Sequence, residues 1–418
     1  MRMLNQNAAE LGLAQSAGGP QLAPFESTRT AIATDTRDDI NMTRHRLIRR
    51  VFHLAKHCGY GNGNVHVAVD LACVQAQRGV DVVFISGGGT FEELLAKHGV
   101  VHIKIDQDQR KPFSLLRAGY SIARLSMRFK PDILHAHMMG AAAVGYMASR
   151  ITGVPLVTTV HNSFDRHSIL MRLGNRVVAV SEAEKKHLLR QGYKSDQVDV
   201  VLNAPLNSPR LDKATIRTGV TLESPCIVAI CGLHRRKGVF DLINACAEVF
   251  RDLPEWRLYI AGEGPDQESL KEQSRSMGLA DRITFLGFVS DPRGLLQQCD
   301  IFVLASYADP CSLVIGEARG AGCAIVATAV GGTPEMLEFG QKGRLISPGK
   351  PKELAAELRS LMTDPIARAE LRRASLEGSE IFDVHRLTGE YERVYQRAVS
   401  TKSFGRHLGQ RSISSWET

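Results

Sequence analysis

The feature that most constrains this chain is a repeated alternation of short β-branched runs with longer helical stretches. It begins near Leu47 with RLIRRVFHLA, VHVAVDLACVQAQRG and VDVVFIS, and it continues through DILHAH, PLVTTVH and VDVVL. Strands separated by helical segments of this length predict a parallel, doubly wound sheet, in which each strand returns to the sheet after a helix. The sequence therefore predicts an α/β fold that begins near residue 47.

The alternation is interrupted once, between Asn207 and Glu223, where Pro209 and several charges stand without a clear strand. A second alternation then runs through CIVAICG, WRLYIAG, RITFLGF, DIFVLAS and CAIVATA. Because 418 residues exceed one ordinary domain of roughly 150 residues, we expect two Rossmann-like, doubly wound domains facing across a cleft. The predicted units are a flexible leader at 1–42, a first domain at 43–208, a second domain at 222–380, a helix at 381–398 with a position against the first domain as one option, and a basic tail at 399–418.

Charge and composition narrow the partners. Lysine and arginine exceed aspartate and glutamate by 52 − 44 = 8, which favours anionic partners such as nucleotides or phospholipid surfaces. Only 6% of the residues are aromatic and no zinc-finger, helix-turn-helix or RNA-recognition pattern occurs, so we predict no nucleic-acid partner. The absence of a long apolar run and of a secretory signal predicts a soluble, cytoplasmic protein. Eight cysteines without a C-x-x-C pair indicate reduced, buried thiols.

Ligands of open parallel sheets bind at the carboxyl ends of the strands, so the residues after each strand are the candidates. The first is GYGNGN, which contains Gly61 and Gly63 between an apolar run and a helix. Glycines there would let backbone N–H groups approach a phosphate at the start of the helix. The spacing differs from the dinucleotide pattern G-x-G-x-x-G, and a tight turn is an equally good interpretation.

The second candidate is CGLHRRKGV, in which Arg235, Arg236 and Lys237 follow Gly232 and precede a helix. Fixed cations at this place could clamp a diphosphate and neutralise charge that develops on a leaving group, as a metal ion otherwise would. The alternative is a solvated basic turn.

The third candidate is AGEGP, where Gly262, Glu263 and Gly264 close a strand and open a helix. An ordinary strand-to-helix turn explains this motif as well as a ligand contact does.

The fourth candidate, SYADPCSLVIGEARGAG, is the most informative. Asp309 lies in a loop after a strand, and Glu317 lies about two turns into a helix predicted to start near Ser312. A carboxylate can accept both hydroxyl hydrogens of a vicinal diol such as that of ribose. The free N–H groups near Ser312 and Leu313 favour an anion. The stretch therefore predicts contacts with two parts of an extended ligand.

Histidines form the fifth candidate. His161 ends an apolar strand in TTVHNS, and His135 and His137 stand in ILHAHMM. A histidine at a strand end is more often structural than catalytic. Metal binding by His135 and His137 lacks a third ligand at an obvious spacing, and we predict no metal site.

Taken together and in this order, the stretches resemble glycosyltransferase family 4, which comprises retaining sugar transferases with two Rossmann-like lobes in the GT-B arrangement. The resemblance covers roughly residues 51–398. CGLHRRKGV looks like the family's G-x-x-x-x-K-G diphosphate segment, while IAGEGP and FLGFVSD, with Phe288, look like the loops that border the nucleotide base. SYADPCSLVIGEARGAGCAIVATAVGG looks like the E-x7-E region, the most specific of these motifs.

The resemblance implies roles for the matching positions. It places Arg236 and Lys237 on the donor diphosphate, Glu317 on the ribose hydroxyls, Asp309 on the transferred sugar, His161 opposite the donor sugar, backbone groups of Cys311, Ser312 and Leu313 beside the sugar and phosphate, and Gly63 at the second glycine of the first loop. Three departures stand out, because the family's usual residues are Glu at 309 and Gly at 62 and often at 312, where this chain has Asp309, Asn62 and Ser312. Donor identity is the property most exposed to these changes.

The resulting expectation is a metal-independent, retaining hexosyltransferase. It would move a sugar from a nucleotide-diphosphate donor to a glycan, a lipid-linked glycan or a small acceptor, with no cofactor. Asp106 and Asp108 form the D-x-D that marks the metal-dependent class of such transferases, and we interpret it as a loop turn. The alternatives are a nucleotide-sugar epimerase or phosphorylase-like enzyme, and a catalytically silent sugar-nucleotide-binding or scaffold protein, which Asp309 and Asn62 motivate.

Peripheral membrane contact is a further expectation. Basic residues cluster between Arg44 and Arg50, and a helix predicted from Phe113 to Lys130 carries Arg117, Arg124 and Arg128 beside apolar side chains. Such a face suits the inner surface of an anionic membrane that carries a lipid-linked acceptor. A helix that covers the sheet with one solvated side is the simpler alternative.

Overall fold

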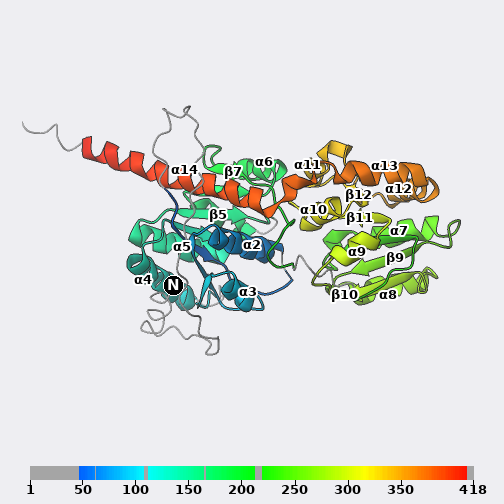
Figure 1. The fold of residues 1–418 in the computed structure, drawn as a ribbon, viewed down its shortest axis with the longest axis horizontal. Coiled ribbons are helices and arrows are strands. Elements are labelled where there is room, and N and C mark those ends of the chain that lie inside the picture. The colour runs from blue at the N-terminus through cyan, green and yellow to red at the C-terminus, as the bar shows by residue number, and fades with distance from the viewer. Residues whose placement is uncertain (1–46, 62, 108–111, 164–165, 212–218, 412–418) are drawn as a thin grey trace, which may run out of the picture.

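The computed structural model describes residues 47–61, 63–107, 112–163, 166–211 and 219–411. The predicted leader, Asn62 and Asp108 lie outside these ranges. Two α/β lobes lie side by side along the long axis of the molecule (Figure 1), and each contains its own parallel sheet. The predicted fold class, two Rossmann-like doubly wound domains, is confirmed.

The first sheet contains seven parallel strands in the order β3-β2-β1-β4-β5-β6-β7. Their bounds are β1 (Arg50–Leu54), β2 (Asp81–Ser86), β3 (Val101–Lys104), β4 (Ile133–Ala136), β5 (Leu156–Val160), β6 (Arg176–Ala179) and β7 (Val198–Val200). The helices between them are α2 (Gly63–Gln77), α3 (Glu92–Lys97), α4 (Pro112–Phe129), α5 (Met139–Thr152), the 3₁₀ segment η1 (Arg166–Leu173) and α6 (Glu182–Arg190).

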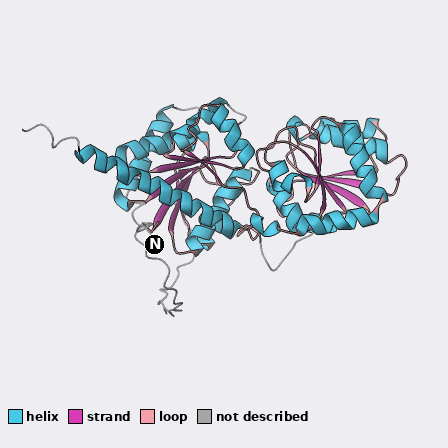
Figure 2. Ribbon diagram, turned by 90° about the horizontal axis from the view of Figure 1, so that it is seen from above, coloured by secondary structure: helices cyan, strands magenta, loops and turns pink. Residues whose placement is uncertain are grey.

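Both faces of this sheet are buried, as expected for a parallel sheet between two helical layers (Figure 2). Successive side chains of a strand point to opposite faces, so β1 serves two cores. Phe52 and Leu54 pack with residues of α4 and α5, whereas Val51 packs with residues of α2 and of the last helix of the chain.

The second sheet contains six parallel strands in the order β10-β9-β8-β11-β12-β13. Their bounds are β8 (Cys226–Ile230), β9 (Arg257–Ala261), β10 (Ile283–Gly287), β11 (Ile301–Leu304), β12 (Ala324–Thr328) and β13 (Arg344–Ile346). The helical segments are η2 (Arg235–Lys237), α7 (Val239–Val249), α8 (Gln267–Ser276), α9 (Arg293–Gln298), α10 (Leu313–Gly320), α11 (Thr333–Met336), η3 (Glu338–Gly340), α12 (Pro351–Thr363), α13 (Pro365–Leu376) and η4 (Ser379–Phe382). β13 is a short strand that the sequence pattern did not indicate.

The chain crosses between the lobes twice, and the two crossings are bonded to each other. It leaves the first lobe after β7, and it returns at η4. The amide of Leu206 donates to the carbonyl of Phe382 at 2.9 Å, and the amide of Val384 donates to the carbonyl of Leu206 at 3.0 Å. We call these two segments the crossing pair.

The last helix, α14 (Val384–Arg411), belongs spatially to the first lobe although it follows the second in sequence (Figure 1). Its residues Leu387, Tyr391, Val394, Tyr395 and Ala398 pack into the core that contains Val51 and the α2 side chains. The helix continues past Ala398 to Arg411, which corrects the expectation of a basic tail that begins at 399. No proline stands between Val384 and Arg411 to end the helix earlier.

All eight cysteines lie in the described part of the chain and are free, and seven of them are buried. This confirms the expected unpaired thiols. No helix of the described residues combines the length and the apolar character needed to cross a membrane.

Candidate active site

The strand order places a crevice at the same point of each lobe. β1 lies between β2 and β4, and β8 lies between β9 and β11, so the chain turns in opposite directions after these central strands. Loops that diverge in this way leave an opening at the carboxyl edge of the sheet, where ligands of doubly wound folds bind. The motifs CGLHRRKGV and SYADPC follow β8 and β11, the two strands that form this point in the second lobe.

Two of the predicted cations point toward the loop that follows β11. Lys237 Nζ donates to Asp309 Oδ2 at 2.5 Å, and the side chains are only 13% and 7% exposed. Arg236 Nη1 donates to the carbonyl of Ala308 at 3.4 Å. The guanidinium of Arg235 instead stacks over the ring of Phe240, 4.7 Å from its centroid. The structure thus separates Arg236 and Lys237, which border the crevice, from Arg235.

Close backbone contact fixes these loops. Gly238 has φ +65°, and a Cβ there would lie 1.8 Å from the carbonyl oxygen of Ala305. The amide of Tyr307 donates to the carbonyl of Arg236 at 2.8 Å. A residue other than glycine at 238 would push the β8 loop away from the β11 loop.

The Gly262–Gly264 turn packs onto the loop that contains Gly232. A Cβ at Gly262 would lie 1.9 Å from the carbonyl oxygen of Cys231, and one at Gly264 would lie 2.3 Å from that of Leu233. The exposed Glu263 accepts a hydrogen bond from the amide of Phe288 at 3.4 Å. The structure therefore brings together the predicted residues after β8, β9 and β10.

The loop from Asp309 to Leu313 also touches the first lobe. Ser181 Oγ donates to the carbonyl of Pro310 at 2.9 Å, and Asn203 Nδ2 donates to the carbonyl of Cys311 at 3.0 Å. Sequence reasoning missed Ser181 and Asn203, although each is a polar residue that comes just after a strand or strand-like run, which was an available signal.

The first glycine loop lies across from this segment. Gly61 has φ +99° and is exposed. A Cβ at Gly63 would lie 3.3 Å from Leu313 Cδ1. The ring of Tyr60 meets the ring of Phe288 edge-on, with 5.6 Å between the centroids. Residues of both lobes therefore converge at the first glycine loop. On the other side of this contact, Ser312 is the N-cap residue of α10, and its side chain makes no capping hydrogen bond.

Glu317 lies on α10 beside a cavity of about 280 Å³. The linker residues 205–208 and 211 line this cavity together with residues of α9 and α10. Burial raises the pKa of Glu317 to about 7, and the nearby positive charge of Arg210 opposes that rise. No hydrogen bond between described residues joins Glu317 to Asp309 or Lys237, so the two predicted carboxylates occupy separate parts of the site.

Arg210 is a third residue that sequence reasoning missed. Its Nε and Nη2 donate to the two carboxylate oxygens of Asp70 on α2, both at 2.9 Å. Ser208 Oγ donates to Asp70 Oδ1 at 2.7 Å. Both side chains of the ion pair are almost fully buried. The linker is thereby tied to the first lobe directly beside Glu317.

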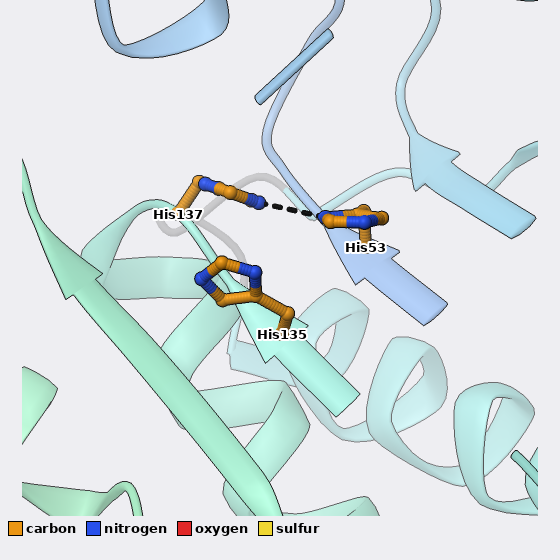
Figure 3. Close-up of side chains that lie close together, drawn as sticks. All are labelled: His53, His135 and His137. Atoms are coloured by element: carbon orange, nitrogen blue, oxygen red, sulfur yellow. Dashed lines mark hydrogen bonds between the residues drawn. The ribbon is translucent and has the colours of Figure 1, made fainter. Parts of the chain in front are cut away.

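The candidate histidines His135 and His137 belong to a buried cluster in the first lobe. His135 and His137 lie at the end of β4, and His53, inside β1, supplies the third imidazole that the sequence did not reveal (Figure 3). One ring nitrogen from each of the three lies within 4.8 Å of those of the other two. All six ring nitrogens have hydrogen-bond partners among the described residues. Among the described residues the three rings thus form a continuous hydrogen-bond network, and their spacing would also suit a metal ion, so the absence of a metal site stays a prediction.

His161 follows β5 at the edge of this cluster. Its Nε2 lies 3.4 Å from Nδ1 of His137. Burial lowers the pKa of His161 to about 3, so the ring is neutral at physiological pH. Positions 133 and 135 alternate on β4 and 157 and 159 on β5, and His137 and His161 continue this period directly after the strands, so these side chains lie on one sheet face. That period of two was the available signal for the cluster.

Asp106 of the D-x-D motif is exposed in the loop after β3. Its companion Asp108 lies outside the described ranges, so the interpretation of the D-x-D as a loop turn stays a prediction.

Two family models match this chain. Residues 61–204 match the model described as Glycosyltransferase Family 4, and residues 214–377 match the one described as Glycosyl transferases group 1. The two matches correspond to the two lobes.

Curated relatives and solved structures agree with these matches. The chain is 24% identical to the N-acetyl-alpha-D-glucosaminyl L-malate synthase of Bacillus anthracis, over 80% of this chain and 93% of that protein. It is 30% identical to the glycogen synthase of Mycobacterium tuberculosis, over 63% of this chain and 68% of that protein. Its fold is similar to that of Anabaena HepE in complex with UDP and glucose, with a TM-score of 0.71, 22% identity and coverage of 83% of this chain and 99% of that one.

Proposed function

The chain belongs to glycosyltransferase family 4 and is a glycosyltransferase with a GT-B fold, and from this premise we propose that it moves a sugar from a nucleotide-diphosphate donor without a metal ion and with retention of configuration. The observation that carries the proposal is the group formed by Arg236, Lys237 and Asp309 at the switch point of the second sheet. Two fixed cations there can hold a diphosphate, and one carboxylate beside them can accept from sugar hydroxyls.

The role of the two cations is to stabilise negative charge on the leaving group. As the bond between the anomeric carbon and the donor phosphate oxygen breaks, its electron pair leaves with the nucleotide diphosphate. Arg236 and Lys237 stabilise this developing charge, which supports a reaction without a metal ion. Because both are held by the β8 and β11 loops before substrate binds, little reorganisation is needed.

The acceptor completes the transfer. Its hydroxyl oxygen forms the new bond to the anomeric carbon on the face from which the diphosphate departs, and its proton passes to the departing phosphate oxygen. Asp309 is ion-paired with Lys237, which weakens it as a nucleophile and supports this one-step route over a two-step one. Glu317 and its cavity would take the ribose, and His161 would face the donor sugar from the first lobe.

A thermal-shift panel tests the donor site. UDP-, GDP- and ADP-sugars are added to the wild-type protein and to the Glu317→Ala and Lys237→Ala variants, and UDP-sugars come first because HepE was crystallised with UDP and glucose. A donor that binds only the folded state raises the apparent stability, by about 2.7 kcal/mol at a hundred times its Kd. One nucleotide class should stabilise the wild type and have less effect on both variants.

Two results would count against the proposal. If no nucleotide sugar raises the melting temperature, the proposed donor site is contradicted. A shift without transfer or slow hydrolysis, across glycan, lipid-linked and small acceptors, favours a silent binding protein instead. Arg235→Ala serves as the matched control, because Arg235 stacks on Phe240 away from the Asp309 loop.

We also propose that α4 docks on an anionic membrane, and the acceptor is then a lipid-linked glycan. The helix exposes Phe113, Leu116, Tyr120 and Met127, and Phe113 is 84% exposed. Arg117, Arg124 and Arg128 are also exposed on this helix, so apolar anchors and positive charge share one surface. In the predicted basic cluster, Arg50 is ion-paired with Asp81, which leaves α4 as the stronger basis for docking.

Vesicle flotation tests this docking. Binding to vesicles with anionic lipid, reduced for Phe113→Asp and absent with neutral vesicles, is the expected result. Ile366→Asp, a similarly exposed apolar position on α13 of the second lobe, is the matched control and should bind like the wild type. Equal recovery with anionic and neutral vesicles would remove the membrane proposal and leave the transferase proposal intact.

A further inference from the structure

The histidine cluster joins three neighbouring strands on the face of the first sheet that α2 and α14 cover. His53 on β1 is the register partner of His135 on β4, and β4 pairs with β5, which precedes His161. Gln75 comes from α2, and Tyr391 and Tyr395 come from α14. Each of these side chains is bonded to the next in the cluster, so its protons can be assigned one after another.

The assignment starts at Gln75. Its Oε1, which can only accept, lies 2.8 Å from His53 Nε2, so His53 carries its proton on Nε2 and leaves Nδ1 bare. His137 Nε2 lies 2.9 Å from that bare nitrogen, in the hydrogen bond that the dashed line in Figure 3 marks, and must therefore be its donor. His137 Nδ1 is then an acceptor, and His161 Nε2, at 3.4 Å, donates to it.

A second branch starts from the other end of the same Gln75 amide. Its Nε2 donates to the hydroxyl of Tyr395 at 3.3 Å, and that hydroxyl donates to His135 Nδ1 at 2.8 Å. His135 Nε2 in turn donates to Thr159 Oγ1 at 2.8 Å. Rotation of the amide would put the Gln75 carbonyl oxygen against Tyr395 and would reverse every donor along both branches. The orientation of this one amide therefore sets the direction of both branches, and these proton positions follow from the orientation with Gln75 Oε1 toward His53.

The chain of donors ends at an unused acceptor. His161 Nδ1 is buried and has no hydrogen-bond partner among the described residues. A buried polar atom without a partner is rare in folded proteins, and a bound ligand or a water molecule can supply the missing partner. With its pKa lowered to about 3 by burial, the His161 ring keeps this lone pair at neutral pH.

We propose that His53 and His137 are positioning residues that hold His161 as the Nε2–H tautomer, so that its Nδ1 accepts a hydrogen bond from a hydroxyl of the bound sugar. The inference rests on the proposed function, in which His161 faces the donor sugar. A neutral imidazole whose tautomer is fixed in advance discriminates a hydroxyl donor from a group that cannot donate.

The test reads the tautomer and the kinetics separately. Nitrogen-15 NMR of protein labelled at histidine reports which ring nitrogen carries the proton, and the His161 signals are assigned by their loss in His161→Gln. The wild type should show a proton on Nε2 and a bare Nδ1. His137→Leu, which removes the acceptor, should give a mixture of tautomers and lower kcat/KM for the nucleotide sugar about tenfold, because one orienting hydrogen bond is lost.

Two further variants separate positioning from packing. His137→Gln keeps an oxygen that can accept from His161 Nε2, so it should retain the tautomer and most of the activity. Tyr391→Phe removes a hydroxyl of the same core, 3.0 Å from Thr159 Oγ1 and outside the His161 branch, and should change neither readout.

Several results would overturn the inference. They are a wild-type His161 protonated on Nδ1, an unchanged tautomer and unchanged kcat/KM in His137→Leu, or one equivalent of a transition metal on His53, His135 and His137 in the purified protein. If the wild type neither binds nor turns over any nucleotide sugar, the proposed function fails on its own, and the wild-type and His137→Gln spectra still decide the tautomer.

Discussion

The two lobes share one strand order but present opposite chemistry at the same topological point. In the first lobe, the residues on and just after β1, β4 and β5 are imidazoles and hydroxyls held in neutral, buried hydrogen bonds. In the second lobe, the loops after β8 and β11 hold Arg236 and the ion pair of Lys237 with Asp309. The fold supplies the crevice, and the residues that follow the strands decide what it recognises.

This difference suits a transfer between two unlike substrate parts. Neutral groups in a low-dielectric site distinguish hydroxyls by the positions of their hydrogen-bond partners, because a donor or acceptor left unpaired there costs free energy. Fixed charges stabilise a group whose charge grows during the reaction. In the proposed function, the sugar and the diphosphate of one donor would therefore meet separate, complementary surroundings on the two lobes.

The largest expected effect is on the reaction rate, and it comes from the charged site of the second lobe. Lys237→Ala removes a cation from the diphosphate and leaves the buried Asp309 without its partner, so kcat should fall about a hundredfold or more. Initial rates at saturating donor measure it. The neighbouring Arg235→Ala should stay within about threefold of the wild type, since that side chain stacks on Phe240. Equal losses in the two variants would contradict the separation of the three cations.

The next largest effect is on stability, and it comes from the neutral hydrogen-bond network of the first lobe. Tyr395→Phe leaves both Gln75 Nε2 and His135 Nδ1 without a partner, so the free energy of unfolding should fall by about 1–3 kcal/mol. Urea denaturation of both proteins measures the difference. Tyr259→Phe in the second lobe, where the hydroxyl accepts from a single amide at Glu223, is the comparison and should cost about 1 kcal/mol. A larger loss for Tyr259→Phe would show that the network is not cooperative.

The two lobes should also respond to pH with opposite sign. The pKa of Glu317 is raised to about 7, so the folded state keeps a proton that the unfolded state releases near 4.5, and this stabilisation is lost as the pH rises through 7. The pKa of His53 is lowered to about 4 by burial, so its contribution is present above 6.5 and is lost as the pH falls toward 4.

Melting temperatures at pH 5, 6, 7 and 8 distinguish the two contributions. Relative to the wild type, Glu317→Gln should gain about 2 °C as the pH rises from 5 to 8, and His53→Gln should gain a similar amount as the pH falls from 7 to 5. Parallel curves for the wild type and either variant would mean that the altered group does not titrate differently in the folded state.

The smallest effect concerns the contact between the lobes. Tyr60→Ala removes the edge-on contact with Phe288, and KM for the donor should rise about threefold with kcat nearly unchanged. Tyr146→Ala, at another partly exposed tyrosine on α5, is the control. A fall in kcat as large as that of Lys237→Ala would place Tyr60 in the chemical step instead.

The alternation in the sequence was enough to predict both sheets, the interruption between them and the start of α10 near Ser312. These features depend on local patterns: strand period, helix caps and the residues that follow each strand. The residues of the second-lobe site follow strands directly, which is why CGLHRRKGV and AGEGP could be recognised as candidates.

The remaining features depend on contacts between distant parts of the chain. Gln75 and Tyr395 are 320 positions apart, and Arg210 and Asp70 are 140 apart, so no local spacing predicts either pair. His53 stands inside an apolar strand, where its sequence neighbours give no sign of the other two histidines. The sequence prediction ends the last helix at Ala398, because the basic composition after that residue is typical of a tail. In the structure α14 continues to Arg411, and no proline interrupts it.

The return of α14 to the first lobe has a consequence for synthesis. The ribosome makes all seven strands of the first sheet before the second lobe, yet the helix that covers one of its faces is made only afterwards. The nascent first lobe therefore lacks Tyr391 and Tyr395, and with them two anchors of its histidines, until the second lobe has been translated. The first lobe is therefore completed after the second, and a chain that stops before α14 lacks the helix that anchors the proposed sugar site.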